Sequence, residues 1–134
     1  METQEKKDIY FYQNLGRLFY AVAFIDNVVR DEEVETLKKF VSSTWVSLDN
    51  EPDEYGSDSA FQIEVVFNWL ESEVFDAQES YDSFKEYYVK HKSLFTEMIN
   101  RRILKTASAI AGAFAGTNKS ELILLTQLHL LIKD

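Results

Sequence analysis

The residues best suited to chemistry lie in a short acidic turn between two apolar segments, within LFYAVAFIDNVVRDEEVETLKKFV (18–41). Hard divalent cations such as Ca²⁺ need several oxygen ligands from one loop, at about 2.3–2.6 Å. The turn supplies carboxylate oxygens and a carbonyl oxygen from Asn27. A divalent cation is therefore the one cofactor to consider, and the candidate metal ligands are Asp26, Asp31, Glu32 and Glu33.

Helix initiation explains the same acids without a metal. The spacing departs from the EF-hand loop, because Val28 stands where a second acid is needed and Asp31 where the glycine is needed. Asp31 would instead cap the following helix, and Glu32 and Glu33 would interact with its N-terminal dipole. We favour capping over a metal at this turn.

A second acidic loop, DNEPDEYGSD (49–58), contains five carboxylates. It also departs from the EF-hand template, because Glu54 stands where the glycine belongs. We expect this loop to be exposed, and to suit a basic partner better than a cation.

Catalytic groups are sparse in the sequence. The two histidines are His91 and His129, and we expect His129 to be buried. With no cysteine and no HExxH spacing, a zinc site is not expected. A histidine–acid pair for base catalysis would need the fold to bring the two groups within about 2.6–3.2 Å. No phosphate loop, dinucleotide fingerprint or nucleophile elbow is visible, so we expect a non-enzymatic protein.

Length and charge restrict the class of protein. At 134 residues, the chain is expected to form a single domain over 1–134. Its net charge of −9 disfavours nucleic acid and anionic membrane surfaces as partners, and favours cations or basic partners. No apolar run reaches the roughly 18 residues of a membrane span, so we expect a soluble chain. The absence of cysteine and of a signal-peptide core fits the cytoplasmic location that we expect.

Apolar residues recur every three or four positions, and the chain has one proline and four glycines. This pattern predicts an all-α, compact bundle of about six helices. The predicted segments are 8–25, 31–48, 60–72, 76–91, 94–115 and one from 119 onward. The third, which contains FQIEVVFNWL, is rich in β-branched and aromatic residues, but capping-box spacing at Ser59 and Gln62 favours a helix.

Two of these segments carry more apolar residues than one face can hold. The sixth is apolar nearly all round, so we expect it in the centre of the bundle. The first has so many aromatic residues that some should be exposed, or covered by a partner or a second subunit. These aromatic residues are Tyr10, Phe11, Tyr12, Phe19, Tyr20 and Phe24.

The two ends of the chain carry a weak internal repeat. Both copies contain the Ala-rich end of a helix, a short turn, an acidic residue at the start of the next helix, and a leucine one helical turn after that acid. The copies are AVAFIDNVVRDEEVETL (21–37) and AIAGAFAGTNKSELILL (109–125). The pattern A-x-A-x-x-D before an E-E-x-x-x-L helix resembles the TerB-like, or tellurite-resistance, family, of which this chain would be a distant member. Asn27 replaces the family's glycine and tolerates a left-handed conformation, whereas Gly116 stands where the family usually has an acid.

The resemblance implies a compact all-α bundle, similar to proteins linked to metal or chemical stress, some with acidic surfaces that bind cations. We therefore expect a non-enzymatic binding or scaffold module, related to stress response, that has a protein partner or self-associates. The alternative is a protein that binds or senses divalent cations through the turn Asp26–Glu33.

Overall fold

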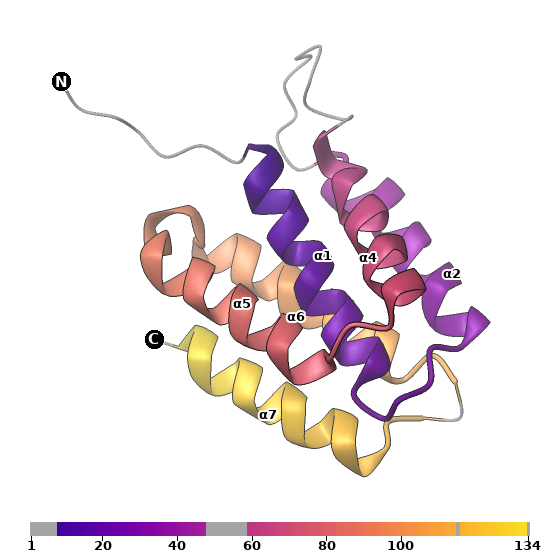
Figure 1. The fold of residues 1–134 in the computed structure, drawn as a ribbon. Coiled ribbons are helices and arrows are strands. Elements are labelled where there is room, and N and C mark those ends of the chain that lie inside the picture. The colour runs from indigo at the N-terminus through magenta and orange to yellow at the C-terminus, as the bar shows by residue number, and fades with distance from the viewer. Residues whose placement is uncertain (1–7, 48–58, 115, 134) are drawn as a thin grey trace, which may run out of the picture.

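The described residues form a bundle of α-helices, as the sequence predicted (Figure 1). A computed structural model describes residues 8–47, 59–114 and 116–133. Its helices are α1 (Ile9–Phe24), α2 (Asp31–Phe40), α4 (Gln62–Glu73), α5 (Ala77–Lys90), α6 (Glu97–Ala111) and α7 (Lys119–Lys133). A π-helical turn, η1 (Val41–Trp45), continues α2, and a 3-10 turn, η2 (Lys92–Leu94), precedes α6. Among the described residues, no helix is long and apolar enough to cross a membrane.

Several helices begin where the sequence predicted. The Asp8 carboxylate accepts a hydrogen bond of 3.2 Å from the Phe11 N–H and starts α1. The Asp76 carboxylate accepts one of 2.9 Å from the Glu79 N–H and starts α5. Capping of this kind satisfies backbone N–H groups that have no partner within the helix. The third predicted segment is helical, so its β-branched residues do not make it a strand.

The central helix is α1, which runs between α4 and α5 and also contacts α6 and α7 (Figure 1). Because neighbours surround it, its aromatic residues are buried on several faces rather than exposed. Phe11, Tyr12, Phe19 and Tyr20 are buried, Phe24 is half-buried, and Tyr10 is exposed. The prediction of an exposed aromatic surface on this segment is therefore wrong except at Tyr10.

The helix α7 lies at the outside of the bundle, against α6 and α1 (Figure 1). Its buried side is formed by Leu124, Leu125 and Leu128, while Leu130 on the opposite side is 68% exposed. The prediction that this segment occupies the centre is wrong. A helix that is apolar all round can have a central place or an exposed apolar face, and here α1 already fills the centre.

The backbones of α1 and α4 cross closely at Gly16. A Cβ atom placed at Gly16 would lie 2.7 Å from the Ile63 carbonyl oxygen and 3.0 Å from Val66 Cβ. Glycine is therefore required here for close approach, not for backbone flexibility. The crossing fixes the buried side of α4 against α1, and it determines which α4 residues face outward.

Candidate functional site

The acidic turn after α1 meets the turn before α7. The side-chain amide of Asn118 donates a hydrogen bond of 2.7 Å to Asp26 Oδ2, and Arg30 Nη1 lies 3.1 Å from the same oxygen. The other Asp26 oxygen, Oδ1, accepts a hydrogen bond of 3.1 Å from the Val28 N–H. Asp26 thus joins the two ends of the chain. The two-turn cluster consists of Asp26, Arg30, Glu33, Asn118 and Glu121.

Two glutamates of this cluster cap their own helices from buried positions. Glu33 Oε1 accepts a hydrogen bond of 2.9 Å from the Arg30 N–H, and Glu121 Oε1 accepts one of 3.0 Å from the Asn118 N–H. Asn118 Oδ1 accepts one of 2.9 Å from the Glu121 N–H, which completes the predicted capping box. Each glutamate is only 1% exposed. The expectation that Asp31 caps α2 is wrong, because the N-cap is Arg30 and the capping carboxylate belongs to Glu33.

The burial of these glutamates affects their protonation. The pKa of Glu33 is raised to about 7. Burial is the largest cause of this shift, and the neighbouring Glu121 carboxyl group contributes to it. Burial also raises the pKa of Glu121, although the Asn118 N–H opposes that shift. Two adjacent buried carboxyl groups do not both ionise at low cost. Glu33 therefore keeps its proton up to about neutral pH in the folded state.

The four predicted metal ligands are not brought together. Asp26 and Glu33 belong to the two-turn cluster, whereas Asp31 and Glu32 are exposed on the first turn of α2. In the described ranges, no group of three or more His, Cys, Asp or Glu residues is arranged to hold a metal ion. The cation site stays a prediction for which the described geometry gives no direct support. The second acidic loop, 49–58, lies outside the described residues.

The internal repeat has a structural counterpart in the two turns. Asn27 has φ of 70° and Gly116 has φ of 85°, so each turn contains one left-handed residue shortly before the next helix. This confirms that Asn27 adopts the conformation for which glycine is usual. The guanidinium of Arg30 also lies over the Phe114 ring, 4.7 Å from its centre. The two hairpins are thus similar in construction and contact each other reciprocally.

The histidines lie apart from this cluster. His91 ends α5 with its ring 4.3 Å from that of Tyr87. His129 is exposed on α7, so the prediction that it is buried is wrong. Beside His129 is a pocket whose described lining is otherwise aliphatic: Leu104, Leu130 and Ile132. A histidine–carboxylate pair is thus not found at His129 among the described lining residues.

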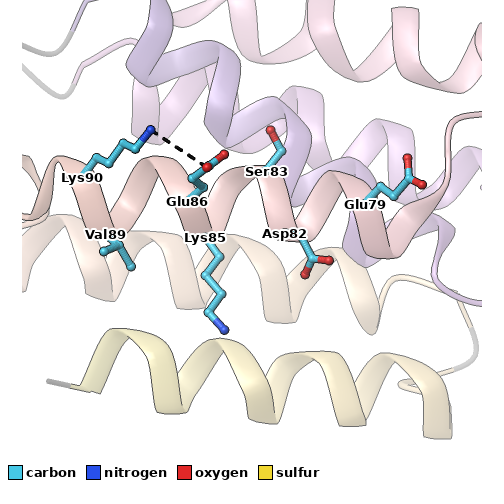
Figure 2. A pocket seen from close by; sticks show the side chains of 7 residues that line it. All are labelled: Glu79, Asp82, Ser83, Lys85, Glu86, Val89 and Lys90. Atoms are coloured by element: carbon cyan, nitrogen blue, oxygen red, sulfur yellow. Dashed lines mark ion pairs between the residues drawn. The ribbon is translucent and has the colours of Figure 1, made fainter.

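One surface pocket follows α5 and has a volume of about 690 Å³. Its described lining residues are Glu79, Asp82, Ser83, Lys85, Glu86, Val89 and Lys90. Figure 2 shows that these side chains spread along one helix and do not converge on one point. Glu86 and Lys90 form an exposed ion pair at 4.0 Å. Catalytic groups must converge on a reacting atom, so this pocket does not have the geometry of an active site.

An exposed apolar surface on α4 was not predicted from the sequence. Phe61, Val65 and Trp69 are spaced by four residues, and they are 41%, 54% and 48% exposed. Phe75, which follows the helix, is 38% exposed. The α4 face is defined as Phe61, Val65, Trp69 and Phe75. The signal was present in the sequence, because FQIEVVFNWL contains more apolar residues than one buried side of a helix needs.

The aromatic end of the α4 face is held in place by the core. The rings of Trp69 and Phe75 meet edge to face with centres 5.0 Å apart. The hydroxyl of buried Tyr20 donates a hydrogen bond of 2.7 Å to the Phe75 carbonyl oxygen. Burial, with smaller effects from Glu71 and Asp76, raises the pKa of Tyr20 to about 12, so this hydroxyl keeps its proton. The exposed aromatic pair is therefore ordered before any partner arrives.

Comparison with known proteins returned no match, either to a family model, to a curated protein or to a solved structure. The resemblance to the TerB-like family therefore remains a prediction from the residues of the two hairpins.

Proposed function

We propose that this chain is a non-enzymatic helical module that binds another protein through the α4 face. The observation that carries the proposal is the exposure of Phe61, Val65 and Trp69 in one row on a helix whose opposite side is buried against α1. Tryptophan and other aromatic residues dominate the energetics of protein interfaces, and their burial removes apolar surface from water. A role in stress response, as the TerB-like resemblance implies, is compatible with such a module.

The two-turn cluster serves the module as a structural element. It ties α2 and α7 together at one end of the bundle through Asp26, Asn118 and the two buried glutamates. The carboxylates of the cluster already accept hydrogen bonds from within the two turns. We therefore assign partner binding to the α4 face and stabilisation of the fold to the two-turn cluster.

Site-specific photo-crosslinking tests the proposal in the organism that encodes the chain. A photoreactive amino acid replaces Val65, and a matched control replaces Val89 on α5, since the two valines are 54% and 58% exposed. We expect a discrete cross-linked protein from position 65 only, and its loss when Trp69→Ser is added. The partner is then purified and mixed with each variant. Binding that is lost in Trp69→Ser and kept in Val89→Ser supports the proposal, whereas equal binding by all variants contradicts it.

A further inference from the structure

The sequence segment that contains α4 is strongly acidic. Residues 40–84 contain eleven of the 23 acidic residues of the chain and none of its 14 basic residues. This third of the sequence therefore carries a charge of −11, and the remainder carries +2, which together give the net charge of −9. The α4 face lies within this acidic segment, and the exposed acids nearest its aromatic end are Glu71, Glu73 and Asp76.

The positions of Glu71 and Glu73 are unfavourable for the helix itself. They lie in the last turn of α4, which has no basic residue, and the C-terminal end of a helix dipole is negative. In α2, by contrast, Asp31, Glu32 and Glu33 occupy the first turn and lysines occupy the last. The acids at the end of α4 therefore cost stability in the free protein, and a cation that approached this end would relieve their repulsion.

One positive charge lies near the other end of the face. Lys38 on α2 lowers the pKa of Glu64 on α4, although burial has the larger and opposite effect, so that this pKa is raised. Glu64 is thus partly compensated within the chain. At the Trp69–Phe75 end, Glu71 and Asp76 raise the pKa of Tyr20 after the larger effect of burial, so their negative charges act at this end of the face.

The shape of the α4 face is suited to a helix. Phe61, Val65 and Trp69 form a ridge of residues four apart, which spans about 12 Å at 1.5 Å per residue. Ridges of this kind pack into the grooves of a second helix, with apolar residues of the partner also spaced by three or four. The described elements include no β-strand whose edge could pair with an extended peptide.

We infer that the partner segment is a basic amphipathic helix, with its apolar side on Phe61, Val65 and Trp69 and its lysines or arginines beside Glu71, Glu73 and Asp76. This inference rests on the proposed function and specifies the chemistry of the partner. Charge complementarity distinguishes such a helix from a second copy of this acidic chain, and from anionic lipid, both of which the acids would repel.

Three designed peptides of about 18 residues, a length at which helices form in water, test the inference. All three share one apolar stripe, and their polar sides carry lysine, glutamine or glutamate. Fluorescence anisotropy of labelled peptide measures binding to the full chain. We expect the lysine peptide to bind about tenfold or more tightly than the glutamine peptide at low salt, with the difference shrinking as added salt screens the charges. The glutamate peptide should bind weakest.

Variants separate this inference from the proposed function. Trp69→Ser should abolish binding of all three peptides. The double substitution Glu71→Gln and Glu73→Gln should lower the affinity for the lysine peptide alone. Glu86→Gln, in the exposed pair with Lys90, is the matched charge control and should have no effect. Circular dichroism establishes that each variant is folded.

The contradicting outcomes differ in what they exclude. Equal affinity for the lysine and glutamine peptides, still lost in Trp69→Ser, would overturn the basic partner and leave the α4 face as a binding site. Two outcomes would show diffuse electrostatic attraction and overturn the inference. In the first, the lysine peptide still binds to Trp69→Ser. In the second, its affinity falls as much in Glu86→Gln as in the variant with Glu71→Gln and Glu73→Gln. Failure of every peptide to bind would overturn the helical partner. A dimer in sedimentation that Trp69→Ser dissociates would assign the face to a second copy.

Discussion

The amide of Asn118 donates a hydrogen bond of 2.7 Å to Asp26, across 92 positions of sequence. Asn118 also caps α7, since its side-chain oxygen accepts the Glu121 N–H. One side chain therefore both starts the last helix and attaches it to the first turn. The arrangement allows the cap and the cross-turn contact to be separated experimentally.

The substitution Asn118→Asp keeps the capping acceptor and replaces the amide donor by a carboxylate that faces Asp26. We expect it to lower the free energy of unfolding at neutral pH by about 1–3 kcal/mol, because a charge-assisted hydrogen bond is lost and a repulsion is gained. Urea unfolding measures the change. The control is Thr96→Asp at the N-cap of α6, where Thr96 accepts the Ile99 N–H at 3.3 Å, and it should be close to neutral. Equal losses at both caps would contradict the cross-turn contact.

The Glu33–Glu121 pair predicts a stability that depends on pH. The folded pKa of Glu33, about 7, lies above its ordinary value of 4.5, so the folded state retains a proton that the unfolded state releases. Stability should therefore fall as pH rises from about 4.5 to about 7 and then level off. Glu33→Gln removes this titration. Over the same pH interval, its free energy of unfolding should rise relative to that of the wild type by on the order of 2 kcal/mol.

The measurement is urea unfolding of both proteins across that pH range. The control is Glu35→Gln, because Glu35 is exposed on the same helix. A difference between wild type and Glu33→Gln that does not change with pH would contradict the raised pKa of Glu33.

The α1–α4 crossing predicts that Gly16→Ala is destabilising, despite the better helix propensity of alanine. The added Cβ would lie 2.7 Å from the Ile63 carbonyl oxygen, so the helices must separate, at a cost of about 1–3 kcal/mol. Gly112→Ala is the control, because its nearest neighbour would be the Ser108 carbonyl oxygen at 3.4 Å. Thermal unfolding should show a lower midpoint for Gly16→Ala than for Gly112→Ala, and the reverse order would be incompatible with this crossing.

The left-handed residue after α4 predicts a stabilising substitution. Val74 has φ of 54°, is 67% exposed, and is β-branched, so it is strained at a position for which glycine is preferred. We expect Val74→Gly to raise the free energy of unfolding by up to about 1 kcal/mol. Val89→Gly, at an exposed valine inside α5, should instead lower it by about 1 kcal/mol. Stabilisation by neither or by both substitutions would argue against strain at Val74.

Calorimetric titration of the chelator-treated protein with Ca²⁺, Mg²⁺, Mn²⁺ and Zn²⁺ decides the cation prediction. Asp26 already accepts hydrogen bonds from Val28, Arg30 and Asn118, so a cation would have to displace them. We expect Asp26→Ala to lower stability without changing the heat of titration. Saturable binding by the wild type that disappears in Asp26→Ala would instead establish the acidic turn as a cation site.

The fold class and several helix boundaries could be predicted because they depend on local patterns. Asp8, Asp76 and the Asn118–Glu121 box act through hydrogen bonds within three residues, so their spacing in the sequence is sufficient. The choice of central helix could not be predicted in this way. The segments that became α1 and α7 are both rich in apolar residues, and only their packing places one inside and the other outside.

The candidate sites show the same division. Asp26 and Glu33 could be singled out from one turn, but their partners Asn118 and Glu121 lie about 90 residues away, and only the weak repeat linked the two turns. On α4, the sequence contained Phe61, Val65 and Trp69, but it did not determine which apolar side of the helix meets α1. The Gly16 crossing determines that side.

The outward position of α7 has a consequence for how the molecule opens. Its outer apolar residues, Leu122, Ile123 and Leu130, are more than half exposed, so α7 should detach at a lower free energy than global unfolding requires. Its first turn is held by Asn118 and lies beside Glu33, whose raised pKa of about 7 makes the open state easier to reach as pH rises from about 4.5 to about 7. Amide hydrogen exchange in α7 should therefore accelerate over that interval beyond the intrinsic chemical rate and then level off, while α1 keeps its protection. The last helix is thus an opening unit whose attachment to the bundle weakens between mildly acidic and neutral pH.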